Sequence, residues 1–551
     1  MPKRPLFRAI LIVITAALAA QCTSVDETPI ERTDIESAAG LIDLQLTESE
    51  IDSMLPDLQD QFSSYQSMRE VDVENAVLPA IVFDPVPRRE ESVDREDLLE
   101  ISPTSRRQLP DDVEKLAFWS VRDLAELIRT RQITSTQLTK MYLARLKKHG
   151  PTLECVISLT EERALEAAAR VDEELSSGRY RGLLHGIPYG AKDLLAVKGY
   201  KTTWGAEPYR EQMIDETATV IKKLDEAGAV LVAKLTLGAL AWGDVWYGGM
   251  TKNPWNLEQG SSGSSAGSAS ATSAGLVAFS IGTETWGSIV SPCTRCGVTG
   301  LRPTFGRVSR TGAMALSWTM DKIGPICRSV EDCAIVFDVI RGPDGADPTV
   351  VEAHFRYEFD EDIHALRIGF LPEDFERDDY YHESDSIALG VIREMGIDLI
   401  PIELPDYPVY PLGIILSAEA AAAFDELTRS GRDDLLVRQI RNAWPNTFRT
   451  ARFIPAVEYI QANRIRSMIM REMEDLDVDI YISPSFGENL LLTNLTGHPC
   501  VVLPCGFDDE GGPVSITFTG QPFEEGKLLA FARAYQERTG FHLKHPPLFE
   551  K

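Results

Sequence analysis

One stretch constrains the fold more than any other: residues 260–275 consist only of Gly, Ala, Ser and Thr. Flexible linkers share this composition, and phosphate-binding loops are also rich in Gly and Ser. However, the second half of the stretch, 266–274, is compatible with a helix and leads directly into the apolar segment 276–281, which predicts a buried strand. A linker is not joined to a core strand in this way, and the Lys-Ser/Thr ending of a P-loop is missing. The stretch therefore predicts a loop-to-helix junction attached to the core.

Short apolar runs alternate with helical patterns along the rest of the main body. Strands are expected at 186–191, 229–232 and 276–281, and helices at 121–128, 135–150, 217–227, 266–274, 417–427, 456–473 and 525–540. Strands that alternate with helices predict an α/β fold. Its large, mixed but mostly parallel sheet should be covered by helices on both faces.

The first 22 residues have the pattern of a signal peptide. Basic residues at 3, 4 and 8 precede the apolar run 9–20, which is shorter than the roughly 20 residues that span a bilayer. We therefore expect export to the periplasm or the medium. Cys22 is a candidate for a lipid anchor, although Gln21 is bulky where lipoproteins carry a small residue.

Two further segments follow the predicted signal peptide. Residues 23–112 are expected to form an acidic N-terminal extension with one amphipathic helix, which the capping-box pattern Thr47-x-x-Glu50 would begin. Residues 113–546 are expected to form the main domain, with a more variable region at about 350–480.

Charge and cysteine content exclude some classes of function. The formal net charge is −29 and no basic run is visible, whereas nucleic-acid binding depends on neutralising phosphates, so a nucleic-acid partner is not expected. Eight scattered cysteines do not resemble a disulfide framework. Cys293 and Cys296 form a C-x-x-C, but no second pair with metal-ligand spacing follows, so buried free thiols are expected.

Two loops carry the residues that nucleophilic catalysis would need. Serines among glycines in 260–275, and again in 282–292 (GTETWGSIVSP), favour a nucleophile beside exposed backbone N–H groups. No His lies near either loop, so a neutral Lys is the alternative base. Lys192 fits this role because it ends the apolar run GIPYGAK, and burial lowers the pKa of an ammonium group.

These motifs resemble the amidase signature family. The resemblance covers about Leu116 to His542 and includes LHGIPYGAKD, the Ser/Gly stretch, GTETWGSI, CGVTGLRPTFGRVSR, DKIGP and TNLTGHPCVVLPCGF. It implies the amidase signature fold and a serine amidase in which Lys192 is the base, Ser264 the bridging hydroxyl on a cis peptide and Ser288 the nucleophile. It also implies an oxyanion hole made by backbone N–H groups and no metal or cofactor; the N–H donors would be those of Thr285, Trp286, Gly287 and Ser288.

The sequence departs from the pattern of the amidase signature family at three positions. Trp286 replaces the Gly or Asp that is common in the oxyanion loop, and Ser262 and Ala266 replace glycines. The family positions Asp193 and Asp321 are expected to be structural. Tryptophans near the motifs indicate an apolar or aromatic acyl group, or simply core packing; they are Trp204, Trp242, Trp246, Trp286 and Trp318.

The expected activity is hydrolysis of the carboxamide bond of a small amide, releasing ammonia or an amine. The alternatives are a glutaminase similar to the A subunit of glutamyl-tRNA amidotransferase, and an amidase-family esterase or carbamate hydrolase. An α/β-hydrolase, suggested by Gly263-x-Ser265-x-Gly267, lacks the required preceding strand. A non-enzymatic binding protein would predict a broken triad. The sequence leaves open the substrate and whether the protein is a monomer or a homodimer.

Overall fold

The computed structural model describes residues 30–41, 44–69, 71, 74–77, 81–86, 96–104, 108–376 and 382–550. The chain forms two compact units, which divide between Glu74 and Asn75. The predicted signal peptide and Cys22 lie outside the described residues. The structural division falls earlier than the expected boundary at 112/113. One reason is that β1 (Leu98–Glu100) pairs in parallel with β12 (Arg356–Glu358), so these residues belong to the main unit.

Among its described residues, the N-terminal unit contains two helices, where the sequence predicts one. The expected helix is α2 (Glu48–Arg69), and its capping box forms: Thr47 N donates to Glu50 Oε2 over 2.6 Å, and Glu50 N donates to Thr47 Oγ1 over 3.4 Å. The additional helix is α1 (Arg32–Leu41), which buries only Ile35 and Ala39. Two buried side chains give too weak a periodic pattern to be read from the sequence.

An 11-stranded sheet forms the centre of the main unit, in the order β14-β13-β15-β17-β16-β10-β11-β9-β3-β4-β2. Its strands are β2 (Val156–Leu159), β3 (Pro188–Lys192), β4 (Val230–Leu235), β9 (Phe279–Glu284), β10 (Thr299–Arg302), β11 (Lys322–Cys327), β13 (Ile368–Phe370), β14 (Leu399–Pro401), β15 (Ile480–Pro484), β16 (Cys500–Phe507) and β17 (Pro513–Gly520). Every residue of β3, β4 and β9 is buried, as expected for strands covered on both faces.

The sheet is mixed, as expected, but its parallel share is smaller than predicted. In the described part of the chain, four pairings are parallel (β3–β4, β3–β9, β13–β14 and β13–β15) and the other six are antiparallel. The sequence pattern identified the strand–helix–strand units around β3. It did not identify short connections such as 508–512 between β16 and β17, which can join only antiparallel neighbours.

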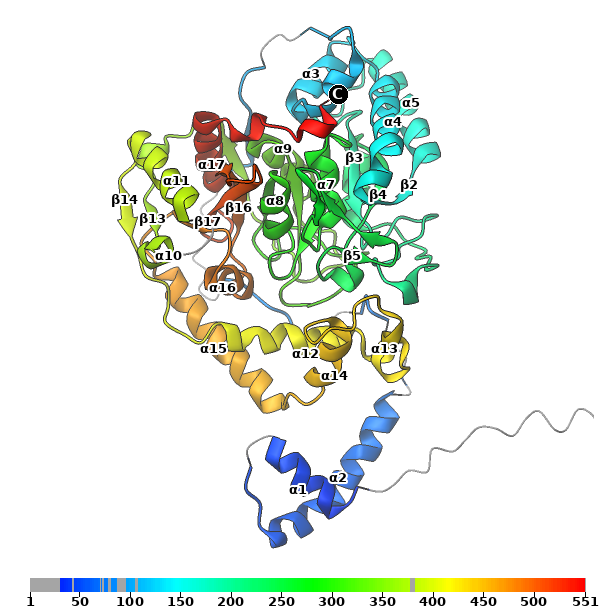
Figure 1. Cartoon of the computed structure of the whole chain (residues 1–551), viewed down its shortest axis with the longest axis vertical. Helices are drawn as coiled ribbons and strands as arrows, with labels where there is room; N and C mark the ends of the chain where they lie inside the picture. Colours follow the sequence, from blue (N-terminus) through cyan, green and yellow to red (C-terminus); the bar gives the residue numbers. More distant parts are fainter. Residues whose placement is uncertain are drawn as a thin grey trace, which may run out of the picture. The chain divides into compact units, whose positions relative to one another are not determined.

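Helices cover both faces of the sheet (Figure 1). On one face, helix α7 (Ala266–Ser273) packs against α8 (Val290–Cys296). On the other face, helix α9 (Val330–Ile340) packs against α17 (Glu525–Thr539). The remaining helices of the main unit are α3 (Val121–Arg129), α4 (Ser135–Leu153), α5 (Glu161–Ser176), α6 (Thr219–Glu226), α10 (Pro372–Glu376), α11 (His382–Glu394), α12 (Ile414–Ala423), α13 (Asp425–Arg429), α14 (Trp444–Ala451), α15 (Ala456–Glu474) and α16 (Glu488–Thr496).

The variable region 350–480 divides between the sheet and a helical layer. β13 and β14 extend the sheet at one edge. The helices α12, α13, α14 and α15 form a layer beside it, drawn in yellow to orange in Figure 1. Among the residues that the structure describes, we find no helix long and apolar enough to span a bilayer.

Candidate active site

Lys192 lies at the end of β3 and is completely buried. Its Nζ donates to Ser264 Oγ at 2.8 Å, to Thr283 Oγ1 at 2.8 Å, to Ser265 Oγ at 3.1 Å and to the carbonyl of Thr283 at 3.4 Å. Within the described ranges, no carboxylate forms an ion pair with it. Burial lowers the pKa of Lys192 to about 7, although the negative charges of Asp321 and Glu284 act in the opposite direction.

Ser264 reaches Lys192 from the loop that joins β8 (Asn256–Gly260) to α7. The Gly263–Ser264 peptide bond is cis, as the resemblance implies. Small residues are required here because the segment is crowded. A Cβ on Gly263 would lie 1.9 Å from the carbonyl oxygen of Gly243, and a Cβ on Gly267 would lie 2.5 Å from that of Cys155. The Ser/Gly composition is therefore a packing requirement and not a sign of a linker.

Ser265 joins the two serine loops. Its Oγ donates to the Thr283 carbonyl at 3.0 Å and accepts from the Thr283 N–H at 3.1 Å, which ties the first loop to β9. Its own N–H donates to the Ser288 carbonyl at 3.1 Å. Ser288, in the second loop, is 8% exposed, whereas Ser264 is only 1% exposed. Of the two serines, Ser288 is thus the more accessible to a substrate.

The loop 285–288 presents backbone donors. In the part of the chain that the structure describes, the N–H groups of these four residues donate to no protein acceptor. Gly287 has a φ of +80°, in the left-handed region that favours glycine. Unpaired N–H groups at and just before Ser288 are the kind of donor that stabilises an oxyanion.

Glu284 fixes the shape of this loop, and sequence reasoning did not identify it. Its carboxylate accepts from the N–H groups of Ile289 and Val290 at 2.7 and 2.9 Å, beyond the loop. Arg302 Nη1 and Asn494 Nδ2 donate to the other oxygen at 2.7 and 2.8 Å. Burial opposes ionisation of Glu284, but these donors, Arg302 above all, lower its pKa to about 2. The signal in the sequence that could have identified Glu284 is its position as an acidic residue at the end of an apolar strand.

Both aspartates that were predicted to be structural make contacts of that kind. Asp193 forms an ion pair with the buried Lys234 at 2.6 Å and accepts from the N–H of Thr203 at 2.8 Å. Asp321 accepts from Thr285 Oγ1 at 2.6 Å and from the N–H groups of Leu316 and Ser317. Asp321 therefore holds the side chain of the first loop residue.

A cavity of about 370 Å³ lies beside the cluster. Its wall includes Thr283 and Thr285 and an apolar part formed by residues such as Leu194, Met314 and Trp318. It also includes charged residues, which are Glu216, Arg310, Asp321, Lys322 and Asp347. On the exposed side of the loop, Trp286 is 40% exposed and its ring centroid is 6.4 Å from that of Tyr410. Of the five tryptophans noted in the sequence, Trp204 and Trp246 are core residues.

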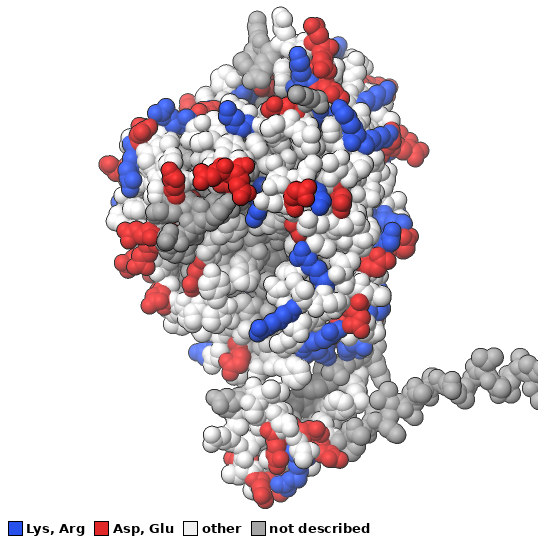
Figure 2. Space-filling model, in the orientation of Figure 1, with Lys and Arg blue, Asp and Glu red and all other residues white. Residues whose placement is uncertain are grey.

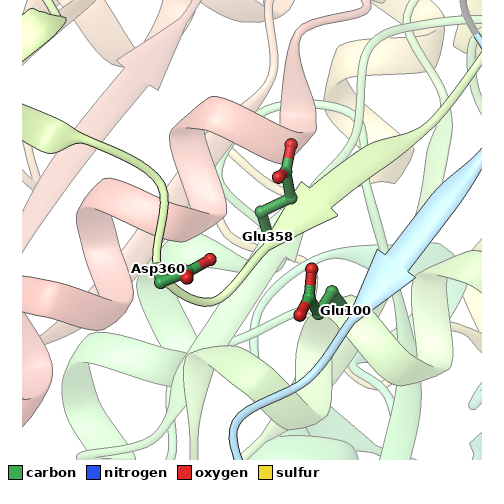
Figure 3. A group of neighbouring side chains, drawn as sticks. All are labelled: Glu100, Glu358 and Asp360. Atoms are coloured by element: carbon green, nitrogen blue, oxygen red, sulfur yellow. The ribbon is translucent and has the colours of Figure 1, made fainter.

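Side chains that could bind a metal lie apart from the serine cluster. Every described cysteine is a buried free thiol, including Cys293 and Cys296, as expected. Among the described residues, a single group of metal-ligating side chains stands close enough to share an ion: Glu100, Glu358 and Asp360 (Figure 3). Glu100 lies on β1, Glu358 on β12 and Asp360 just after β12, and these two strands carry none of the residues of the serine cluster. No further observation indicates a metal at these three acidic residues.

Known proteins share this architecture. The Amidase family model matches residues 137–491. The A subunit of the glutamyl-tRNA(Gln) amidotransferase of Thermoanaerobacter pseudethanolicus is 31% identical over 77% of this chain and 97% of its own length; that of Chloroflexus aurantiacus is 34% identical over 76% and 96%. The structure of the native peptide amidase from Stenotrophomonas maltophilia has a TM-score of 0.69 at 29% identity, covering 80% of this chain and 100% of that one. The chain therefore belongs to the amidase signature family.

Proposed function

We propose that the protein is an amidase that hydrolyses the carboxamide bond of a small amide through an acyl-enzyme on Ser288. The observation that carries the proposal is the 2.8 Å contact between Lys192 Nζ and Ser264 Oγ in a buried cluster without a carboxylate partner for the lysine. A lysine with a pKa near 7 is neutral in a large fraction of molecules at neutral pH and can act as a base.

The reaction would proceed by a two-proton relay. Lys192 takes the proton of Ser264 Oγ, which takes the proton of Ser288 Oγ as that oxygen bonds to the substrate carbonyl carbon. The N–H groups of residues 285–288 stabilise the oxyanion, each donor contributing roughly 2.7–4 kcal/mol. The C–N bond then breaks, and the amine leaves with a proton returned from Lys192 through Ser264. Water attacks the resulting ester, gives its proton to the same relay and releases the acid and free Ser288.

The surroundings of the loop favour an apolar acyl group. The 370 Å³ cavity adjoins Thr283 and Thr285 and is lined mainly by apolar side chains, including Met314 and Trp318. A pocket of this size, with apolar side chains such as Met314 and Trp318 in its wall, has room for a small apolar group. The exposed pair Trp286 and Tyr410 adds apolar surface at the other side of the loop.

The experiment is a substrate panel combined with a fluorophosphonate probe. Aryl amides, peptide amides, short aliphatic amides and nitrophenyl esters are tested on the wild type, Ser288→Ala and the control Ser270→Ala, whose hydroxyl contacts the Lys252 carbonyl instead. We expect Ser288→Ala to lose at least about 10⁴-fold in kcat/KM and all labelling, and Ser270→Ala to retain both. Full labelling of Ser288→Ala would refute the proposal, and faster turnover of esters than of every amide would favour the esterase alternative.

A glutaminase is the second candidate, because the curated relatives that match over nearly their whole length belong to amidotransferases. The free amino acid glutamine carries an ammonium and a carboxylate. The cavity lining includes acidic and basic residues, among them Glu216 and Arg310, so its charge does not exclude this candidate. Ammonia release from glutamine, measured with the chain alone and beside the aryl amides, separates the two. Turnover of glutamine at a rate above that of the aryl amides would favour the glutaminase.

Export of the protein is also proposed, from the pattern of residues 1–22 alone. Mass spectrometry of the protein recovered from the producing cell tests it. A mature N-terminus near residue 22 would support export, and added mass of acyl chains on Cys22 would support the lipid anchor. An intact Met1 terminus in the cytoplasmic fraction would contradict both.

A further inference from the structure

One segment of this acidic chain has a local excess of positive charge. Residues 435–471 contain seven arginines, and Glu458 is the sole acidic residue among them, whereas the whole chain has a net charge of −29. This segment includes α14 and most of α15 in the helical layer; the last three residues of α15 lie beyond it and include Glu472 and Glu474. In Figure 2, basic side chains gather over the part of the main unit where Figure 1 places α13 and α14.

One stripe of α15 combines exposed apolar residues with arginines. Val457, Ile460, Arg464, Met468 and Arg471 lie at spacings of three, four, four and three residues, which places them within a narrow arc of the helix. All five are exposed. The opposite face of α15 packs into the main unit through Ala462, Arg466, Ile469, Met470 and Met473.

The stripe continues toward α14. Phe453, which lies between the two helices, is exposed, and so are Ile440 and Arg441 just before α14. The exposed fractions of Ile440, Phe453, Val457, Ile460 and Met468 lie between 50% and 68%. We call these five apolar residues, with Arg441, Arg464 and Arg471, the basic–apolar face. Exposed apolar residues grouped in this way mark interaction sites.

The arginines of the face are available to a partner. Arg449 and Arg452 nearby form ion pairs with carboxylates of Asp433 and Asp425. In contrast, the guanidinium groups of Arg441, Arg464 and Arg471 form no ion pair with any described residue. An anionic partner would therefore gain three charge contacts without breaking existing ones.

Three kinds of occupant can be compared by their chemistry. A second copy of the chain, packed face to face about a twofold axis, would bring unpaired arginines against one another. A nucleic acid would match the arginines but leave the exposed Phe453, Ile460 and Met468 without apolar partners. An anionic bilayer matches both, because apolar side chains enter the acyl boundary while arginines contact lipid phosphates.

We propose that the basic–apolar face docks the protein peripherally on the surface of an anionic lipid bilayer. The inference does not rest on the proposed amidase reaction, since none of the face residues belongs to the serine cluster. α15 would lie in the plane of the interface, with its stripe toward the lipid.

Vesicle co-sedimentation tests the proposal. The full chain carries Cys22→Ser, so that no acyl chain can be attached, and is mixed with phosphatidylglycerol or phosphatidylcholine vesicles. The test variants are Ile460→Ser/Met468→Ser and Arg464→Gln/Arg471→Gln. The controls are Ile387→Ser and Arg538→Gln, which change exposed residues elsewhere. Unchanged thermal unfolding and unchanged turnover of a soluble amide verify that each variant is folded.

We expect binding to phosphatidylglycerol vesicles that weakens with added salt and is much weaker on phosphatidylcholine. Each removed arginine should lower partitioning about fivefold, and the apolar pair at least tenfold, while the controls bind as the wild type does. Equal binding of the wild type and the face variants would overturn the proposal. Concentration-dependent dimerisation or nucleic-acid binding that the same variants abolish would overturn it in favour of that partner.

Discussion

Lys192 and Lys234 stand on neighbouring parallel strands, and both are completely buried, yet they have different partners. Lys234 forms an ion pair with Asp193 at 2.6 Å and donates to the Lys201 carbonyl at 3.1 Å. Lys192 contacts only hydroxyls and one carbonyl, and burial lowers its pKa to about 7. This difference shows that burial alone does not make a lysine available as a base. A counter-ion determines whether a buried lysine supports the fold or remains available to take a proton.

Among the buried lysines, the largest expected effect on activity comes from removing Lys192. Lys192→Met should lower kcat/KM by about 10³-fold, because no other described side chain contacting Ser264 can take its proton. The fold should persist, since the substitution leaves no carboxylate without its partner. Steady-state kinetics and chemical denaturation measure the two quantities. An active variant would mean that another group is the base.

Removing the paired lysine should instead affect stability. Lys234→Met leaves the Asp193 carboxylate buried and without its cation, which costs about 3–5 kcal/mol in the free energy of unfolding. Denaturant titration measures this, with Asp193→Asn/Lys234→Met as the matched control that should recover part of the loss. A single variant as stable as the wild type would remove the contrast between the two lysines.

A smaller effect should follow from changing the charge near Lys192. Asp321 raises the pKa of Lys192 by its negative charge, so Asp321→Asn should lower that pKa. Because the neutral lysine is the active form, kcat/KM rises as pH increases through the pKa. The rise should therefore move to lower pH in the variant, by about one unit or less. The exposed Asp215→Asn serves as the control, and a shift to higher pH in Asp321→Asn would contradict the assignment.

The smallest effect is expected at a third buried lysine. Lys322 donates to the Met320 carbonyl, and burial, together with the positive charge of Arg302, holds its pKa well below 10.5. It contacts neither serine. Lys322→Met should keep kcat/KM within about twofold and leave the free energy of unfolding equal or higher, because a buried amine is removed. A loss of activity comparable to that of Lys192→Met would show that proximity to the serines is not what distinguishes Lys192.

Local signals in the sequence predicted much of this arrangement. The helices expected at 121–128 and 135–150 correspond to α3 and α4, which Ser120 and Thr134 cap, and β3 ends at Lys192 as the apolar run indicates. The resemblance brought Lys192 and Ser264 into one cluster, and the structure has them in contact.

Long-range partners could not be read in the same way. Glu284 depends on Asn494, which is 210 residues away, and no local pattern links the two. The pairing of Asp193 with Lys234 and the antiparallel part of the sheet also depend on tertiary contacts. Nor did the sequence indicate which of Lys192 and Lys234 pairs with a carboxylate, since that follows from the register of β3 and β4.

The pH dependence of fluorophosphonate labelling tests the role of Lys192 without reference to any substrate. Labelling should occur on Ser288, identified by peptide mass spectrometry. Its rate in the wild type should rise with a single ionisation near pH 7 to a plateau above it, and this rise should be absent in Lys192→Met. The same inflection in Lys192→Met, or modification of a serine other than Ser288, would contradict the account.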